Sequence, residues 1–453
     1  MKKYISYLMF ISAIAMAMPL TSCMHNDNDD DEYSFSGDAA ITTFYLAGAK
    51  QLMHTTSSTG EDSTYYESLT TTDYKFNIDN INGKIYNNDS LPYGTDAAHI
   101  LVNVTAKSSG YVYLKSLTAD EYYYVGGDSI DFSQPRTMRV LSQDGSSWRD
   151  YEVKVNIHQQ DGDIMQWHHS EANSDIASLG GMKLIEAGGE MYLFGSNGTA
   201  TIVMKANGDA TQWEKQEITL GSDAWQNTVE RDGNIYTLSG TTLLMLSNGT
   251  WNTVSDNAPI ARLVAAGSKL LFGYDADNKL VASADGTTWT AETMDDDGAP
   301  LPTQSISYVA QTLKTTANIE RIIIIGKAEG EEYIQAWSRL ADNTDASTPY
   351  VWTYIDTAGD YRYAATALDG FTAIAYDNTI IATALKNGKL QPFKQSRDNA
   401  ITWKATDSLP LPDDIDTNME TFAMAADSNN FIWIVSGNTG EVWRGRLNRL
   451  SWQ

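Results

Sequence analysis

Six side chains in the C-terminal two-thirds of the chain have the chemistry to bind a sugar or a carboxylate. Aromatic rings can stack on sugar rings, and a guanidinium donates two parallel hydrogen bonds to one carboxylate. All six are predicted in or beside connections between repeated β units, where loops on a rigid scaffold concentrate recognition. The candidate ligand-binding residues are Trp225, Arg262, Tyr308, Tyr361, Arg362 and Glu420. The alternative for Arg262 and Tyr308 is that they belong to strands and only pack.

The sequence shows no catalytic or metal-binding motif beside these residues. It contains no phosphate-binding glycine motif, nucleophile elbow or triad spacing. Residues 295–298 begin like an EF-hand loop, but Ile306 stands where the bidentate Glu is required. His168 and His169 are adjacent, and adjacent strand residues point to opposite faces. The sequence therefore predicts no metal, no cofactor and a non-catalytic role.

The elements that position the candidates repeat along the chain. A Trp preceded by a polar or β-branched residue recurs at Trp213, Trp251, Trp289, Trp352, Trp403 and Trp452. A repeat of roughly 40–50 residues with several short strands per unit is typical of a β-propeller. The sequence therefore predicts an all-β fold with a six-bladed propeller over residues 163–453.

Each predicted blade has four strands, counted from the axis to the rim. The apolar second strands, such as residues 321–325, fit a position between neighbouring blades. The Trp of the fourth strand is expected to pack against the next blade. We expect residues 164–168 to close the last blade beside residues 441–446, with Trp452 as the competing element.

Two turns resemble the Asp-box of sialidase-type propellers. They are Ser283-Ala284-Asp285-Gly286-Thr287-Thr288-Trp289 and the segment from Ser396 to Trp403. In such a turn the Asp caps its own backbone and the Trp anchors the strand. A sialidase also needs an arginine cluster and a Tyr–Glu pair, and Tyr361-Arg362-Tyr363-Ala364 is the nearest match to its arginine motif. The resemblance supports the fold, and a sialidase-like glycan-processing enzyme remains an alternative.

The charge balance excludes one class of partner. The chain of 453 residues has 58 acidic and 31 basic residues and a formal charge of −27. Binding of nucleic acid requires clustered Lys and Arg, so no nucleic-acid partner is expected.

The N-terminus has the pattern of a bacterial lipoprotein. Lys2 and Lys3 precede an apolar run, and Leu20-Thr21-Ser22-Cys23 matches a lipobox. This pattern predicts a signal peptide over residues 1–22 and a lipid-anchored Cys23, the only cysteine. At about 17 residues the apolar run is short for a membrane span, although a signal anchor is the alternative.

Residues 23–36 form an acidic stretch that cannot bury enough apolar surface to fold, and they are predicted to be a tether. Residues 37–158 then show short alternating runs joined by turns, including a hairpin signal at Asp144-Gly145. This pattern predicts a small immunoglobulin-like β-sandwich. Residues 47–71 are low in apolar content and are expected to be a long loop.

The sequence resembles a domain-of-unknown-function family of surface lipoproteins from Bacteroides-type bacteria. The resemblance rests on residues 36–44, 89–95, 143–145, 151–155 and 443–450. It implies an N-terminal sandwich and a C-terminal kelch- or sialidase-like propeller. The tether also resembles the acidic export signal of such lipoproteins. The family carries no established activity.

These observations predict a non-catalytic binding protein anchored to the outer membrane through Cys23. A glycan or an envelope protein is the expected ligand. The alternatives are a scaffold subunit of an outer-membrane assembly and the glycan-processing enzyme. The cell surface is the favoured location, with the periplasmic face as the alternative.

Overall fold

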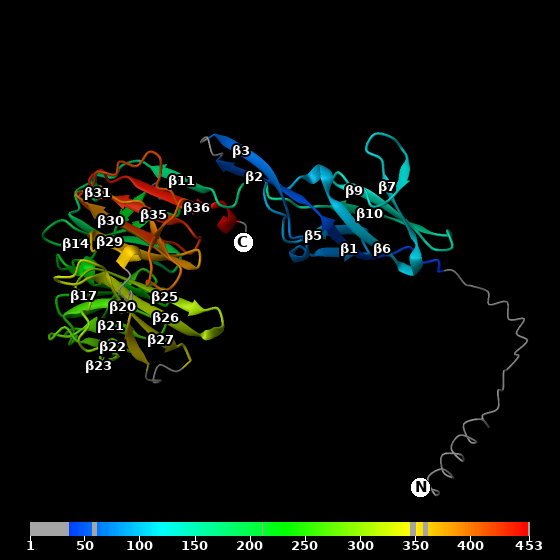
Figure 1. The fold of residues 1–453 in the computed structure, drawn as a ribbon. Coiled ribbons are helices and arrows are strands. Elements are labelled where there is room, and N and C mark those ends of the chain that lie inside the picture. The colour runs from blue at the N-terminus through cyan, green and yellow to red at the C-terminus, as the bar shows by residue number, and fades with distance from the viewer. Residues whose placement is uncertain (1–35, 57–60, 211, 345–349, 357–360, 452–453) are drawn as a thin grey trace, which may run out of the picture. The chain divides into compact units, whose positions relative to one another are not determined.

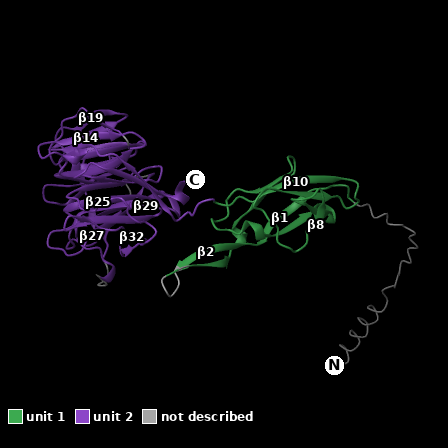
Figure 2. Ribbon diagram, turned by 90° about the horizontal axis from the view of Figure 1, so that it is seen from above, with its two compact units in different colours: residues 1–158 green, residues 159–453 purple. Residues whose placement is uncertain are grey.

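A computed structural model of the chain describes residues 36–56, 61–210, 212–344, 350–356 and 361–451 (Figure 1). The predicted signal peptide, Cys23 and nearly all of the predicted tether lie outside these residues. The regular secondary structure of the described part is almost entirely β-strand, and the chain divides into two compact units between His158 and Gln159 (Figure 2). None of its helices is long and apolar enough to span a membrane.

The first unit contains three sheets in the part that the structure describes. The two-stranded sheets are β1 (Ile41–Gly48) with β6 (Leu101–Ala106), and β2 (Lys50–Thr56) with β3 (Asp62–Ser68). The six-stranded sheet has the order β4 (Phe76–Asp79), β5 (Lys84–Asn87), β10 (Trp148–Lys154), β9 (Arg136–Leu141), β7 (Tyr111–Lys115) and β8 (Tyr122–Tyr124). Short 3-10 helices are η1 (Thr71–Asp73), η2 (Ala97–His99) and η3 (Lys107–Ser109).

One face of the six-stranded sheet forms the core of this unit. Met138, Val140 and Val153 are fully buried there and pack with Phe44 and Leu46 of β1. Since successive strand residues point to opposite faces, the residues between them form the outer face. The predicted hairpin around Asp144-Gly145 is confirmed by the antiparallel pairing of β9 with β10.

The expectation of a long loop over residues 47–71 is wrong. β2 and β3 pair along their whole length in this segment, from Lys50 opposite Ser68 to Thr56 opposite Asp62. The two strands are rich in Thr and Tyr, which favour strands without adding to an apolar pattern. A two-stranded ribbon with no buried face leaves no hydrophobic alternation to detect.

The second unit contains six sheets in its described residues, numbered here in chain order. Sheet 1 has β12 (Gly181–Ala187), β13 (Glu190–Ser196), β14 (Thr201–Ala206) and β15 (Trp213–Lys215). Sheet 2 has β16 (Thr228–Arg231), β17 (Asn234–Ser239), β18 (Thr242–Ser247) and β19 (Thr250–Ser255). Sheet 3 has β20 (Arg262–Ala266), β21 (Leu271–Tyr274), β22 (Leu280–Ser283) and β23 (Thr290–Ala291).

Sheet 4 has β25 (Gln304–Leu313), β26 (Thr316–Lys327), β27 (Gln335–Asp342) and β28 (Val351–Tyr354), with β24 (Thr293–Met294) parallel to β28. Sheet 5 has β29 (Asp369–Tyr376), β30 (Thr379–Lys386), β32 (Lys394–Ser396) and β33 (Lys404–Ala405), with β31 (Lys389–Leu390) on β30. Sheet 6 has β34 (Phe422–Ala426), β35 (Ile432–Ser436), β36 (Val442–Leu447) and β11 (Met165–Ser170). The helical turns are α2 (Ser174–Ala177), η4 (Ala224–Asn227), η5 (Tyr361–Tyr363) and η6 (Asn448–Ser451).

The first strands of the sheets form a closed ring. Each of β12, β16, β20, β25, β29 and β34 contacts the next, and β34 contacts β12. The second strands are buried on both faces, as in β26, where Ile322 to Ile325 are at most 1% exposed. Face-to-face sheets around a ring of inner strands give the unit its propeller-type architecture.

The last sheet is closed by the segment that precedes the first sheet. β11 pairs with β36, from Met165 opposite Leu447 to Ser170 opposite Val442. This pairing confirms the predicted closure, whereas Trp452 lies outside the described residues. Gly445 stands opposite Trp167, and a Cβ atom there would lie 2.4 Å from the indole. A glycine at this position is what allows the ring to lie flat on β36.

The tryptophans pack on the preceding sheet, so the expectation that they pack on the next one is wrong. Trp251 of sheet 2 lies 6.3 Å from Phe194 of sheet 1, measured between ring centroids. Trp352 of sheet 4 lies 5.2 Å from Phe272 of sheet 3. Side chains alternate between the faces of a strand, so the register of each fourth strand decides which neighbour receives its Trp.

Candidate functional site

The six predicted ligand-binding residues follow the connections that lead from each sheet to the next. Trp225 lies in η4, and Arg262 is the first residue of β20. Tyr308 lies within β25, while Glu420 precedes β34 by two residues. Tyr361 and Arg362 lie in η5, on the connection from sheet 4 to sheet 5.

Arg262 is engaged by the backbone and by a neighbouring connection. Its guanidinium donates hydrogen bonds to the carbonyl of Thr303 and, at 3.3 Å, to Oε1 of Gln226. Burial lowers the pKa of Arg262, with a smaller opposing effect from Tyr274. These contacts link the start of sheet 3 to the connection between sheets 1 and 2, which carries Gln226, and to the connection between sheets 3 and 4, which carries Thr303.

Lys183 of β12 lies beside this arginine in the ring of inner strands. Its Nζ atom is 5.9 Å from the centroid of the Tyr308 ring. Burial lowers the pKa of Lys183 to about 8, and the charge of Arg262 adds to this effect. Arg262, Tyr308 and Lys183 therefore gather around one point of the ring, although they come from three different sheets.

For Trp225, Arg362 and Glu420 the structure gives other contacts, whereas the side chain of Tyr361 is not described. Trp225 packs its ring against Gly181 and belongs to a hydrophobic cluster between sheets 1 and 2. Arg362 is exposed, with its guanidinium carbon 5.8 Å from the centroid of the Tyr363 ring. Glu420 is exposed, and its amide donates to Oδ1 of Asn438 at 2.7 Å.

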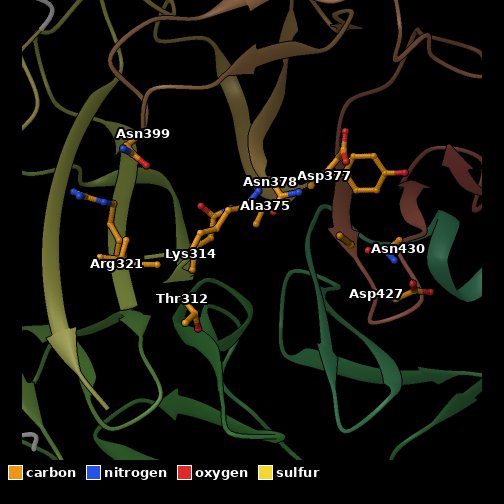
Figure 3. A pocket seen from close by; sticks show the side chains of 13 residues that line it. Thr312, Lys314, Arg321, Ala375, Asp377, Asn378, Asn399, Asp427 and Asn430 are labelled. Carbon is orange, nitrogen blue, oxygen red and sulfur yellow. The ribbon is translucent and has the colours of Figure 1, made fainter. Parts of the chain in front are cut away.

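A cavity of about 460 Å³ opens at the opposite end of the strands, where the first strand of a sheet turns into the second. It is formed by these turns in sheets 4, 5 and 6. In Figure 3, Arg321 and Asn399 lie toward one end and Asp427 and Asn430 toward the other, with Lys314 between them. Its size falls within the range of small-ligand sites.

The acidic groups of this cavity already have partners. Asp377 accepts a hydrogen bond from the guanidinium of Arg449. The carboxylate of Asp427 accepts from the amides of Asn429 and Phe431 and from Nε1 of Trp433, at 2.8–2.9 Å. These bonds hold the turns in place and leave the basic groups as the charges available to a ligand.

A second cavity of about 410 Å³ shares Arg321 and Asn399 with the first. It is bounded by β26, β27 and β28 of sheet 4 and by the Asp-box turn of sheet 5. Tyr350 and Tyr354 border it, but their rings have other partners. The Tyr354 ring packs on Trp337 at 5.3 Å between centroids, and the Tyr350 centroid lies 5.9 Å from the guanidinium carbon of Arg339. The two cavities therefore meet at one guanidinium.

Arg321 is partly exposed, and only some of the N–H groups of its guanidinium donate hydrogen bonds within the described residues. Its Nη1 atom donates to Oγ of Ser338 at 2.9 Å. Within the described residues neither Arg321 nor Lys314 forms an ion pair. A guanidinium carries five N–H donors in a planar fork, so donors of Arg321 remain for a ligand. The site is thus equipped to bind a carboxylate or sulfate beside neutral hydroxyl groups, which Asn378, Asn399 and Asn430 can hydrogen-bond.

Arg321 and Asn399 were not among the residues predicted to bind a ligand. A charged residue at the start of the apolar run 321–325 was the available signal for Arg321. The Asp-box resemblance covered Asn399, but assigned that segment to structure alone. The turn residues of sheets 4 to 6 gave no signal, since Asn and Asp are ordinary in turns.

The chain matches two domain profiles over most of its length. Residues 161–453 match the profile described as the DUF6242 beta propeller domain. Residues 44–155 match the DUF6242 N-terminal domain, a domain of unknown function. No curated relative matches the sequence.

Several solved structures share a distant similarity. An auxiliary nutrient binding protein from Bacteroides thetaiotaomicron is 8% identical with a TM-score of 0.36, covering 79% of this chain and 98% of that one. The soluble aldose sugar dehydrogenase from Escherichia coli is 10% identical with a TM-score of 0.34, covering 62% and 100%. The calcium structure of a Trichoderma reesei carbohydrate-active enzyme of family AA12 is 12% identical with a TM-score of 0.35, covering 62% and 95%. At such values these similarities say nothing about what this chain binds.

Proposed function

The chain belongs to the DUF6242 family, and we propose that it is a non-catalytic binding protein of the cell envelope whose propeller binds a short acidic oligosaccharide. The observation that carries this proposal is the position of Arg321. Its guanidinium borders both cavities and has one side-chain hydrogen bond, to Ser338. A carboxylate or sulfate on the ligand would take its remaining donors.

The surroundings of Arg321 favour a sugar as the carrier of that acidic group. Asn378, Asn399 and Asn430 line the first cavity with amides that both donate and accept, as sugar hydroxyls require. Ser338 and Thr353 line the second cavity with hydroxyl groups, which also donate and accept hydrogen bonds. Two cavities that meet at one arginine fit a ligand of a few sugar units.

The charge of the whole protein limits the length of the ligand. A formal charge of −27 repels an extended polyanion before it reaches the site. A short oligosaccharide with one acidic group meets little of this repulsion, and Lys314 and Arg321 compensate its charge locally. The ligand is therefore a small acidic glycan and not an acidic polymer.

The proposal places this protein at the outer membrane through a lipid on Cys23, with the acidic tether of residues 23–36 directing it to the cell surface. We further propose that each of the six sheets is one propeller blade and that the first unit is an immunoglobulin-like domain. These finer assignments rest on the lipobox, on the repeat of tryptophans and on the ring of inner strands.

Calorimetric titration of the protein with sialyllactose, digalacturonate and lactose tests the binding site. We expect the acidic sugars to bind more tightly than lactose. Replacing Arg321 by Ala removes charge-assisted hydrogen bonds worth roughly 1.5–3 kcal/mol, so binding should weaken about tenfold or more.

Arg397→Ala is the matched control, because Arg397 is exposed and lies outside both cavities. It makes the same change of charge and should leave the affinity unaltered. If Arg321→Ala and Arg397→Ala weaken binding equally, the loss of affinity comes from long-range electrostatics and not from contacts of Arg321 with the ligand. Failure of the wild-type chain to bind either acidic sugar would refute the proposed function.

A further inference from the structure

The outer face of the six-stranded sheet in the first unit is covered by aromatic rings. On β7, Val112 and Leu114 point into the core, so Tyr111 and Tyr113 point outward. Tyr113 pairs with Tyr124 on one side and with Arg139 on the other. The adjoining residues on this face are Tyr122 of β8 and Trp148 and Asp150 of β10.

Arg139 is held between two of these rings. Its guanidinium carbon lies 4.3 Å from the centroid of Tyr122 and 3.9 Å from that of Trp148. Its Nε and Nη2 atoms donate to the two carboxylate oxygens of Asp150, each at 2.7 Å. This bidentate pair fixes the arginine, and the arginine in turn fixes the two rings that sandwich it.

Four of the rings contact Arg139 or one another, yet the platform remains open to solvent. Trp148 is 58% exposed, Tyr124 is 63% exposed and Tyr111 is 54% exposed. Tyr113 and Tyr124 contact each other edge to face, with 6.1 Å between their centroids. Tyr111 and Trp148 both pair with Leu141, from strands on either side of it, so about two strand spacings of roughly 4.8 Å separate them. The face is therefore an ordered aromatic platform wider than a single ring.

We propose that this platform, formed by Tyr111, Tyr113, Tyr122, Tyr124, Arg139 and Trp148, binds a neutral polysaccharide with a flat, β-linked backbone. The C–H faces of such a chain are apolar and stack on aromatic rings, while its hydroxyls reach the phenol groups at the edges. This site lies in the first unit and stands independently of the propeller cavities.

The chemistry of the platform argues against charged ligands and against a protein. Arg139 is paired with Asp150, and Lys115 beside the Tyr122 ring is paired with Asp120, so both cations of this face already have a carboxylate partner. Protein hot spots lie in well-packed pockets, whereas this surface is the flat face of a sheet. A ring-rich sheet face whose cations are paired with carboxylates matches the apolar face of a neutral sugar chain.

Affinity electrophoresis of the whole chain tests the proposal, with xylan, mixed-linkage β-glucan, galactomannan and dextran as probes in separate native gels. Wild-type protein should be retarded by at least one of the β-linked polymers and not by dextran, whose α-linked backbone is not flat. The double variant Tyr124→Ala/Trp148→Ala should bind that polymer about tenfold more weakly or worse. Both side chains are mostly exposed, so the thermal unfolding midpoint should fall by only a few degrees, through the lost contacts with Arg139 and Tyr113.

Tyr66→Ala is the matched control, since Tyr66 is 56% exposed but lies on β3, outside the platform. It should be retarded like the wild type. Retardation of the double variant equal to that of the wild type would overturn the proposal, as would unretarded migration of the wild type in all the β-linked gels. A change of oligomeric state in the double variant without a change in retardation would also overturn it, in favour of a protein interface. Arg321→Ala should behave as the wild type in these gels, which separates this test from that of the proposed function.

Discussion

Tyr308 of sheet 4 reaches across the inner strand of sheet 3 to the backbone of Glu230 in sheet 2. Its hydroxyl accepts a hydrogen bond from the Glu230 amide at 2.8 Å and donates one to the Glu230 carbonyl at 3.1 Å. Burial raises the pKa of Tyr308, and the nearby Glu230 adds to this effect. One side chain therefore links inner strands that are not neighbours in the ring.

Removing this hydroxyl should destabilise the second unit. Tyr308→Phe keeps the ring but leaves a backbone donor and acceptor without partners, at a cost of about 1–3 kcal/mol. Urea unfolding followed by Trp fluorescence measures this change, because every tryptophan except Trp148 lies in the second unit. Tyr363→Phe, at an exposed tyrosine, is the control. Equal unfolding midpoints for the two variants would contradict the role given to Tyr308.

Lys183 should make stability depend on pH in the alkaline range. Its pKa falls from the ordinary 10.5 to about 8, first through burial and then through Arg262. Between these values the unfolded chain binds more protons than the folded one, so this group raises stability as the pH rises from about 8 to 10.5. Below pH 8 the cost of the charged lysine is present in full.

Lys183→Met should therefore stabilise the chain at pH 7 by about 1–2 kcal/mol, a value reduced for the partial exposure of the side chain. The advantage should shrink toward pH 10.5. The measurement is the free energy of unfolding of both proteins at several pH values, with exposed Lys386→Met as the control. An advantage that stays constant with pH would show that titration of Lys183 is not its cause.

Asp285 should stabilise its Asp-box turn through backbone hydrogen bonds. Oδ1 accepts from the amides of Thr288 at 2.7 Å and Thr287 at 2.8 Å, and these bonds hold the pKa of Asp285 well below its ordinary 3.8. Asp285→Ala should cost about 1 kcal/mol at pH 7. Because the depressed pKa contributes stability above pH 3.8, the loss should diminish as the pH falls below that value.

The thermal unfolding midpoint, measured at pH 7 and at pH 3, provides this test. Asp277→Ala is a suitable control, since Asp277 is an exposed aspartate in another turn of the same sheet. If both variants lower the midpoint equally, the cause is lost surface charge and not the turn.

Cys23 should determine whether the protein stays with the membrane. An acylated cysteine gives stable anchoring when more than one chain is attached, at about 0.8 kcal/mol per buried methylene. In cells, Cys23→Ala should move the protein from the detergent phase to the aqueous phase of a partition assay. The control variant Thr21→Ser keeps the lipobox pattern, so it should partition into the detergent phase like the wild type. Equal partitioning of wild type and Cys23→Ala would exclude the lipid anchor.

Local patterns in the sequence were enough to predict the class of fold and some of its pairings. The alternation on either side of Asp144-Gly145 predicted the hairpin of β9 and β10, because turn chemistry and strand pattern lie within a few residues of each other. The same holds for the apolar second strands of the sheets. The pairing of β11 with β36 could be predicted over a long distance, since a closed ring of sheets leaves one edge to be filled.

The tertiary structure alone decided which sheet face each tryptophan occupies and which residues form the candidate site. Arg321 and Asn399 are far apart in the sequence, and they border the same cavities because the second strand of sheet 4 lies beside the Asp-box turn of sheet 5. The exposed platform around Arg139 likewise depends on a strand order in which β8, β7, β9 and β10 lie side by side. Residue types and spacing report on one strand at a time, whereas strand order, register and the approach of neighbouring sheets arise from packing between distant segments.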